Sequence, residues 1–312
     1  MGVGQSSRGD HLISLTAHEA FLAYEAVRHR LPRALPPNGG YRQAQTLEEI
    51  SDLFDAFLLD AFGVLNIGET AIPGVIGRVE SLKARGKRVM VVSNAASVPH
   101  QALVAKYQRL GFDFAPEDIV TSRATMTARM NVDAGQNWGV MLGADAHLND
   151  LAPLRMTVLG DDPLTYDAVD GFLLIGSGTW TEARQAMLEC SLCDRKRRVL
   201  VANPDIVAPR EDGFSAEPGH FAHKLADRTN VVPEFFGKPF SNIFDLALTR
   251  LGPLRKDRVV MVGDTLHTDI LGAQSAGISS ALIASYGFFA DEDVRRAIEV
   301  AGIVPDFLVD RP

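Results

Sequence analysis

The sequence predicts an α/β protein: a doubly wound parallel sheet into which a second α/β domain is inserted. Strand-like apolar runs alternate with helix-like segments at both ends of the chain, which is typical of a parallel sheet covered by helices. These runs lack polar alternation, as expected when both faces of a strand are buried. About 100 residues with their own α/β rhythm separate the two blocks, and a chain of 312 residues is long enough for two domains.

Residues 1–45 are predicted to form a helix and a linker. The stretch Thr-Ala-His-Glu at 16–19 matches a capping box, and apolar residues follow it at helical spacing: Ala20, Ala23, Tyr24 and Val27. Residues 31–40 (LPRALPPNGG) end this helix, because Pro and Gly break regular structure. A second capping-box pattern at 46–49 predicts a short helix that leads into the first strand.

The parallel sheet is predicted to be built from residues 46–130 and 237–312. In the first part we expect a strand at 56–60, a helix ending at Gly86, a strand at 88–94 and a helix over 99–112. In the second part we expect a strand at 258–264, a helix at 268–277, a strand at 279–285, a helix at 291–302 and a strand at 305–310.

Residues 131–236 are predicted to form the inserted domain. Four of its runs are strand-like: WGVMLG, MTVLG, GFLLIG and RVLVAN. Two longer stretches are helix-like: TEARQAMLEC and HFAHKLADRT. This segment therefore has the elements of a sheet and helices of its own.

The composition favours a cytoplasmic enzyme or binding protein. With 39 acidic and 31 basic residues the net charge is -8, which argues against a nucleic-acid partner. No apolar run approaches the roughly 18 residues of a transmembrane helix, and residues 1–14 lack the apolar core of a signal peptide. We therefore expect neither nucleic acid nor a membrane as a partner.

Two residue pairs suggest metal or redox chemistry but have simpler explanations. Cys190 and Cys193 form Cys-x-x-Cys in a helix-like stretch with no second pair nearby, so ordinary helix cysteines are favoured over a redox pair or a zinc site. His220 and His223 lie three residues apart, and solvated helix residues are favoured there over a metal pair.

Polar side chains end three of the predicted strands. Asp60 ends the first strand, Ser93 and Asn94 end the second, and Asp264 ends a third, with Asp269 five residues later. Each alone could be a helix cap or part of a turn. Because ligands bind outside the carboxyl ends of strands in an open parallel sheet, we expect these side chains to face one crevice. Carboxylate oxygens are ligands that Mg²⁺ prefers, so the cluster predicts a Mg²⁺ site.

This arrangement resembles the haloacid dehalogenase (HAD) superfamily over roughly residues 46–310. Four family motifs are matched: Asp60-Ala-Phe-Gly-Val-Leu65 for the first, Ser93 for the second, Lys238 in FGKPF for the third, and Gly263-Asp264 with Asp269 for the fourth. The resemblance implies a HAD-like Rossmannoid core.

The large insertion resembles the cap domain of the class IIA subgroup, and so do two further stretches: residues 72–97 and VANPD at 201–205. This subgroup includes nucleotide, glycolate-phosphate and pyridoxal-phosphate phosphatases. The resemblance therefore implies a small phosphate ester as the substrate. Because caps of this class often dimerise, it also implies a homodimer.

The resemblance assigns a metal and a nucleophile. Asp60 would attack phosphorus and form an aspartyl-phosphate, a reaction that carboxylates support. Mg²⁺ would be held by Asp60, the backbone carbonyl of Phe62 and Asp264. Asp269 would order the waters of the metal or hold Lys238.

The remaining motif residues would bind the substrate. Lys238 would supply positive charge, while Ser93 and the backbone N–H groups that follow Asp60, at Phe62 and Gly63, would bind phosphoryl oxygens. Asn94 lies beside Ser93 at the same strand end. In the inserted domain, Asn203 and Asp205 flank a proline, and they either contact the substrate or only shape the turn: the sequence is Asn203-Pro204-Asp205.

Phe62 departs from the family pattern. Most family phosphatases have an Asp there, which protonates the leaving oxygen and then activates water. General acid–base catalysis typically contributes about 10²–10⁴-fold, and a phenyl ring carries no proton. Glu69 and His267 are substitutes by proximity in sequence only. Without another acid, we expect strong discrimination for good leaving groups.

Three functions stay open at this point. A Mg²⁺-dependent phosphatase is favoured because the whole fourth motif and the large cap are present. A phosphate-ester binding or regulatory protein with little turnover is the first alternative, because of Phe62. A dehalogenase-like, carbon-centred hydrolase is the second, because family dehalogenases often have an aromatic residue at this position.

Overall fold

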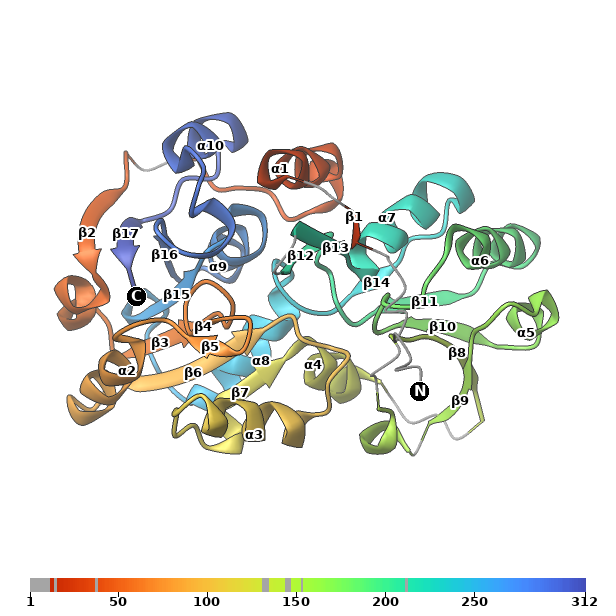
Figure 1. Ribbon diagram of the computed structural model, residues 1–312, viewed down its shortest axis with the longest axis horizontal. Helices are drawn as coiled ribbons and strands as arrows, with labels where there is room; N and C mark the ends of the chain where they lie inside the picture. Colours follow the sequence, from red (N-terminus) through yellow and green to blue (C-terminus); the bar gives the residue numbers. More distant parts are fainter. Residues whose placement is uncertain are drawn as a thin grey trace, which may run out of the picture.

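The computed structural model describes residues 12–13, 16–36, 39–130, 135–143, 147–152, 154–210 and 213–312. Two sheets lie side by side, each with its own helices (Figure 1). Among the described residues, no helix has both the length and the apolar composition needed to cross a membrane.

The larger sheet has seven strands, and every pair of neighbours in it is parallel. Their order is β2 (Arg42–Thr46), β17 (Phe307–Arg311), β16 (Ser279–Ile283), β15 (Val259–Gly263), β3 (Ala56–Leu59), β6 (Arg88–Ser93) and β7 (Ile119–Thr121). The central strand β3 is buried along its whole length, which explains its unbroken apolar sequence.

Helices cover both faces of this sheet. Phe57 and Leu59 of β3 face one apolar cluster, which includes residues of α2 (Val75–Ala84) and α3 (His100–Arg109). The alternate residues, Ala56 and Leu58, face another, which includes residues of α8 (Ser241–Leu251) and α9 (Leu271–Ala276). The remaining helices of this half are α4 (Ser122–Arg129) and α10 (Val294–Ala301). The predicted doubly wound sheet is confirmed.

The second sheet has five strands, in the order β14 (Glu234–Phe235), β11 (Arg198–Val201), β10 (Gly171–Leu174), β8 (Asn137–Met141) and β9 (Arg155–Val158). Its helices are α5 (Pro163–Asp167), α6 (Glu182–Asp194) and α7 (Pro218–Thr229). It has a separate apolar core of its own. The expected inserted α/β domain is therefore present, while the limits 131–236 stay a prediction.

Two small antiparallel sheets complete the described structure. One consists of β1 (Leu12–Ile13), β13 (Gly213–Ala216) and β12 (Val207–Arg210). The other is a hairpin of β4 (Asn66–Ile67) and β5 (Thr70–Ala71), just beyond Asp60 and Phe62. The pairing of β1 with β13 joins the start of the described chain to the inserted domain.

The N-terminal helix is confirmed, but the element predicted after it is different. α1 spans Ala17–Ala26, and Thr16 and Glu19 form the expected reciprocal cap. The second capping box is wrong: Thr46 makes no capping bond, and Leu47–Leu53 is a 3₁₀ helix. Residues 42–46, expected in or beside a linker, form β2, because this polar segment pairs with the edge of β17.

α1 contacts both halves of the molecule. It lies between α10 and α7 in Figure 1. On the side of the larger sheet, Tyr24 stacks on His267 with ring centroids 5.1 Å apart, and Glu25 Oε1 lies 2.5 Å from His267 Nε2. On the side of the inserted domain, the Tyr24 hydroxyl accepts a hydrogen bond of 3.2 Å from the Ile206 N–H, and Arg30, in the 3₁₀ turn after α1, pairs with Asp227.

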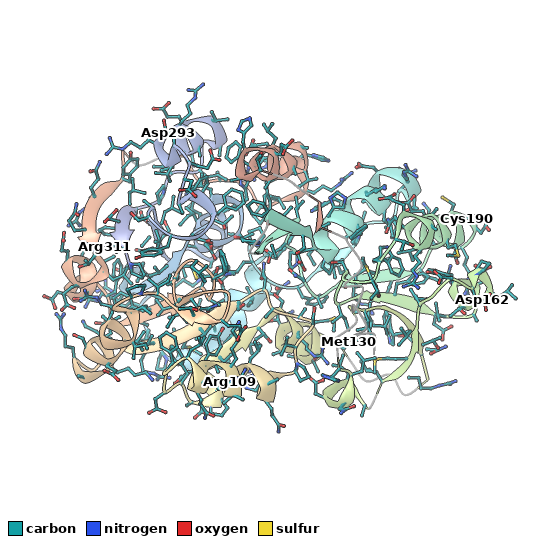
Figure 2. The ribbon with its side chains drawn as sticks, viewed as in Figure 1. Arg109, Met130, Asp162, Cys190, Asp293 and Arg311 are labelled. Atoms are coloured by element: carbon teal, nitrogen blue, oxygen red, sulfur yellow. The ribbon has the colours of Figure 1, made fainter. Side chains whose placement is uncertain are left out.

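The cysteine and histidine pairs have different surroundings. Cys190 and Cys193 are free, exposed thiols on α6, and Figure 2 shows Cys190 at the outer edge of the inserted domain. The expectation of solvated histidines is wrong for His223, which is buried and stacks on Phe235 at 4.9 Å. This face of α7 turns inward, toward the apolar core of the inserted domain.

Burial of His223 predicts acid sensitivity. Burial lowers the pKa of His223 from 6.5 to about 4, and neither of its ring nitrogens has a hydrogen-bond partner among the described residues. The neutral ring therefore contributes stability that is complete above about pH 6.5 and is lost as the pH falls toward 4. Between about pH 7 and 4.5 we expect this residue alone to lower the free energy of unfolding by about 2.5 kcal/mol.

The variant His223→Phe should lack this component, because a phenyl ring can stack on Phe235 and cannot be protonated. Urea unfolding at the two pH values measures the difference. His18→Gln, at an exposed position of α1, controls for the loss of a histidine. An equal loss of stability on acidification in His223→Phe and in the natural protein would contradict the prediction.

Candidate active site

The site is built at the carboxyl ends of three neighbouring strands. β3 lies between β15 and β6, so Asp60 follows the central strand and Ser93 ends β6. The Asp60 N–H donates to the Val262 carbonyl oxygen at 2.9 Å, which fixes the start of this loop beside β15. Asp264 follows β15 by one residue. The structure therefore brings the predicted strand-end residues to one edge of the sheet.

Three carboxylates and one lysine converge there. One oxygen from each of Asp60, Asp264 and Asp269 lies within 4.8 Å of the others. Lys238 Nζ lies 2.5 Å from Asp60 Oδ1 and 2.7 Å from Asp269 Oδ1. The side chains of Lys238 and Asp269 are 2% and 0% exposed, whereas that of Asp60 is 15% exposed. Of the two carboxylates that contact Lys238, Asp60 is therefore the one that solvent or a substrate can reach.

The charges in this cluster do not balance. Burial disfavours the charged form of Lys238, but the charges and hydrogen bonds of Asp269 and Asp60 prevail and raise its pKa. Burial, together with the charges of Asp60 and Asp269, raises the pKa of Asp264 well above its usual range. One ammonium group faces three carboxylates, so the cluster can accept additional positive charge.

Two glycines hold Asp264 in place. Its Oδ2 accepts a hydrogen bond of 2.8 Å from the Phe288 N–H, and its Oδ1 accepts one of 2.9 Å from the Thr265 hydroxyl. A Cβ atom at Gly63 would lie 2.4 Å from Asp264 Oδ2, and one at Gly287 would lie 2.0 Å from it. Both glycines also have positive φ, so these positions exclude a side chain for two reasons.

Asn94 braces the loop that carries Lys238. Its Oδ1 accepts from the Lys238 N–H at 2.7 Å and from the Ser122 hydroxyl at 2.9 Å. Its Nδ2 donates to the Lys238 carbonyl oxygen at 2.9 Å and to Asp205 Oδ1 at 2.7 Å. Asn94 therefore holds the backbone of Lys238 in position. Its expected contact with the substrate stays a prediction.

The two polar residues of the Asn-Pro-Asp stretch point to different places. Asn203 is buried, and its Nδ2 donates to Glu217 Oε2 at 3.1 Å within the inserted domain. Asp205 reaches across to Asn94. Asp205 therefore joins the candidate site, whereas Asn203 shapes the loop by accepting from the Asp205 N–H at 3.0 Å.

Neither substitute for the missing acid lies in the carboxylate–lysine cluster. Glu69 is largely exposed and pairs with Lys106 at 2.8 Å. His267 is buried against α1, where its Nε2 contacts Glu25. Burial lowers the pKa of His267, while Glu25 opposes this shift. Both residues are therefore engaged elsewhere, and the ring of Phe62 stands partly exposed at the position two after Asp60.

Sequence reasoning missed three contributors to the site: Tyr24 from α1, Gly287 behind Asp264, and the bond between Asn94 and Asp205. Burial and the nearby charges of Asp205, Asp269 and Asp264 raise the pKa of the Tyr24 phenol. No local motif marks these residues, because each reaches the site through long-range packing.

Two family models match the chain: a haloacid dehalogenase-like hydrolase model over residues 57–152 and a HAD-hydrolase-like model over residues 235–311. They account for the segments that supply Asp60, Ser93, Lys238 and Asp264. The chain belongs to the HAD superfamily. It is therefore an enzyme of a hydrolase family, and its inserted α/β domain and its relatives place it in class IIA.

Named relatives of this HAD chain are phosphatases. It is 27% identical to a 4-nitrophenylphosphatase of Schizosaccharomyces pombe, covering 84% of this chain and 93% of the relative. It is 26% identical to an acid sugar phosphatase of Staphylococcus haemolyticus, covering 73% and 84%. A possible sugar phosphatase of the HAD superfamily from Cytophaga hutchinsonii has a similar structure, with a TM-score of 0.75, 25% identity and coverage of 86% and 98%.

The close approach of Gly63 to Asp264 allows a test of the expected Mg²⁺ site in this HAD chain. Gly63→Ala should displace the Asp264 carboxylate and weaken the thermal stabilisation by Mg²⁺, because its Cβ would overlap Oδ2. Gly74→Ala is the matched control: its φ of 84° is close to the 74° of Gly63, but its Cβ would meet no atom within 4 Å.

Both variants should lose about 1–2 kcal/mol of stability through the left-handed backbone. Only Gly63→Ala should also lose its response to Mg²⁺, measured as the shift in unfolding temperature on adding the metal. If the two variants respond to Mg²⁺ alike, Gly63 does not position Asp264 for the metal.

Proposed function

We propose that this chain is a Mg²⁺-dependent phosphatase of small phosphate esters that forms an aspartyl-phosphate on Asp60. The observation that carries the proposal is the cluster itself, in which a buried lysine holds a partly exposed carboxylate beside two further carboxylates. The phosphatase activities named for its relatives support the same substrate class.

The donor set fits Mg²⁺. Hard divalent cations take oxygen ligands, and the three carboxylates exceed the one lysine in charge. Asp60, Asp264 and the backbone carbonyl of Phe62 would hold the ion, with Asp269 acting through water or through Lys238. When bound, the ion neutralises charge on the phosphoryl group, which otherwise repels the nucleophilic carboxylate.

The side chains of the site supply positioning and charge, which is most of what phosphoryl transfer needs. Lys238 would neutralise phosphoryl charge and hold Asp60 in place through the contact described above. Ser93 and the backbone N–H group of Phe62 would bind phosphoryl oxygens. The expected role of the Gly63 N–H is not supported, because it donates to the Asn66 carbonyl oxygen at 3.0 Å. Asp60 would then attack phosphorus from the carboxyl end of β3.

Phe62 favours one alternative, a phosphate-ester binding protein with little turnover. A dehalogenase-like reaction is disfavoured, because family dehalogenases do not need Mg²⁺ and this chain keeps three converging carboxylates. A panel of phosphate esters and a halogenated carboxylic acid, each with and without Mg²⁺, separates these functions. Metal-dependent ester turnover supports the phosphatase, ester binding without turnover supports the alternative, and halide release from the haloacid without metal indicates the dehalogenase.

Asp60→Asn and Asp264→Asn should each abolish turnover of 4-nitrophenyl phosphate, because an amide neither attacks phosphorus efficiently nor neutralises a cation. Both substitutions keep the size of the side chain, so circular dichroism should be unchanged. Asp245→Asn, at an exposed position of α8, is the control for loss of an aspartate. Near-normal turnover by a folded Asp60→Asn variant would rule out covalent catalysis by Asp60.

A further inference from the structure

The proposed phosphatase reaction needs a proton donor for the leaving oxygen, and Phe62 cannot provide one. The inference below rests on that proposed function. Any substitute must carry a titratable proton, lie close enough to be influenced by the charges of Asp60 and Lys238, and have an atom free to face the substrate. Glu69 and His267 fail because both are paired elsewhere. Asp205 of the inserted domain meets all three conditions.

The loop that carries Asp205 is fixed from both sides. Within the inserted domain, Asn203 Oδ1 accepts from the Asp205 N–H at 3.0 Å, and the Asp205 carbonyl oxygen accepts from the Gly219 N–H at 3.0 Å. On the side of α1, the Tyr24 hydroxyl binds the N–H of the next residue, Ile206. The position of this carboxyl group is therefore set by the fold.

Asn94 connects this loop to the nucleophile. Its Nδ2 donates both to Asp205 Oδ1 at 2.7 Å and to the Lys238 carbonyl oxygen at 2.9 Å. The ammonium group of the same lysine contacts Asp60 Oδ1. Pro204 also packs against the lysine loop, since a Cβ atom at Gly237 would lie 2.9 Å from Pro204 Cδ. The loop of Asp205 therefore packs against the loop of Lys238, whose side chain contacts Asp60.

One oxygen of Asp205 remains available. Asn94 binds Oδ1, and within the described part of the chain no hydrogen bond engages Oδ2. Part of the residue stays accessible at the domain junction. A proton on Oδ2 could therefore be given to a leaving group that enters between the two domains.

The electrostatic surroundings suit such a role. Burial raises the pKa of Asp205 to about 7; the hydrogen bond from Asn94 and the charge of Lys238 oppose this shift, while the charges of Asp60 and Glu217 add to it. The phenol of Tyr24, on α1, also lies near this carboxyl and stays neutral. A group that titrates near neutral pH can serve as an acid in one step and as a base in the next.

We propose that Asp205 is the general acid and base of this enzyme, supplied by the inserted domain in place of the residue that Phe62 replaces. In the first step an oxygen of Asp60 bonds to phosphorus, the bond from phosphorus to the leaving oxygen breaks, and that oxygen takes the proton of Asp205. In the second step Asp205 takes a proton from water, the water oxygen bonds to phosphorus, and the aspartyl-phosphate bond breaks. Asp60 and Asp205 are then restored, and the products are an alcohol and inorganic phosphate.

The test is the dependence of kcat/KM on the pKa of the leaving group, with aryl and alkyl phosphates at saturating Mg²⁺. An enzyme with a general acid should show a shallow dependence. Asp205→Asn keeps an oxygen for Asn94 but has no acidic proton. It should lose about 10²–10⁴-fold with alkyl phosphates and much less with 4-nitrophenyl phosphate. It should also lose the limb of the pH profile near pH 7.

Two further variants sharpen the test. Asp194→Asn, which removes an exposed carboxylate at the end of α6 in the same domain, should behave like the natural protein. Adding Phe62→Asp to Asp205→Asn should restore alkyl phosphate turnover at least about tenfold, because the acid then returns beside the nucleophile. If Asp205 had a purely structural role, adding Phe62→Asp would not restore alkyl phosphate turnover.

Three results would overturn the assignment. Equal losses by Asp205→Asn with aryl and alkyl phosphates would show that Asp205 only positions the domains. A steep leaving-group dependence in the natural protein, which needs no variant to fold, would show that no acid operates. If the natural protein turns over no phosphate ester at all, the proposed function fails and the acid has no reaction to serve. If the natural protein does turn over aryl phosphates, but Asp205→Asn leaves the leaving-group dependence of kcat/KM unchanged, only the role of Asp205 fails and the proposed function stands.

Discussion

The buried ammonium group of Lys238 is the interaction on which the rest of the site depends. An unpaired buried charge costs several kcal/mol, so Asp60 and Asp269 must both lie beside it. Asn94 holds the lysine backbone by its N–H and its carbonyl oxygen. The preceding residue must be Gly237, since a Cβ atom there would lie 2.1 Å from the Ser122 hydroxyl oxygen. One buried charge thus fixes residues from four separate chain segments.

The same cluster explains why the catalytic proton is better held outside it. Around Lys238 the three carboxylates leave an excess of negative charge, which favours a cation, and a carboxyl group beside a bound cation would be held in its ionised form. Asp205 is linked to the Lys238 backbone by two hydrogen bonds through Asn94, and there the charge of Lys238 partly offsets that of Asp60. In the proposed mechanism, separation into two environments lets one carboxyl group act as the nucleophile while another keeps a proton near neutral pH.

Local pattern in the sequence was enough for five strands of the larger sheet and for the strand-end residues, but not for its two edge strands, β2 and β7. Asp60, Ser93 and Asp264 follow from the position of each at the end of a buried apolar run, because parallel strands end at one edge. Contacts across long separations were not predictable. Asn94 and Asp205 are 111 residues apart, and Tyr24 and Ile206 are 182 apart. The predictions for the polar strand β2 and for His223 failed for the same reason, because tertiary packing rather than local periodicity decides the structure at both places.

If the proton donor lies on the inserted domain, as proposed, the position of α1 affects catalysis. When acid and nucleophile are two residues apart, the backbone fixes their separation; here it depends on how the two domains are held together. α1 and the 3₁₀ turn that follows it (Arg28–Arg30) join them. Tyr24 and Glu25 lie against His267 on one side, and Tyr24 contacts Ile206 while Arg30 pairs with Asp227 on the other. Because Tyr24 binds the residue next to Asp205, any movement of this helix changes the position of the acid. In the proposed mechanism the N-terminal segment would therefore help to align proton transfer with attack by Asp60.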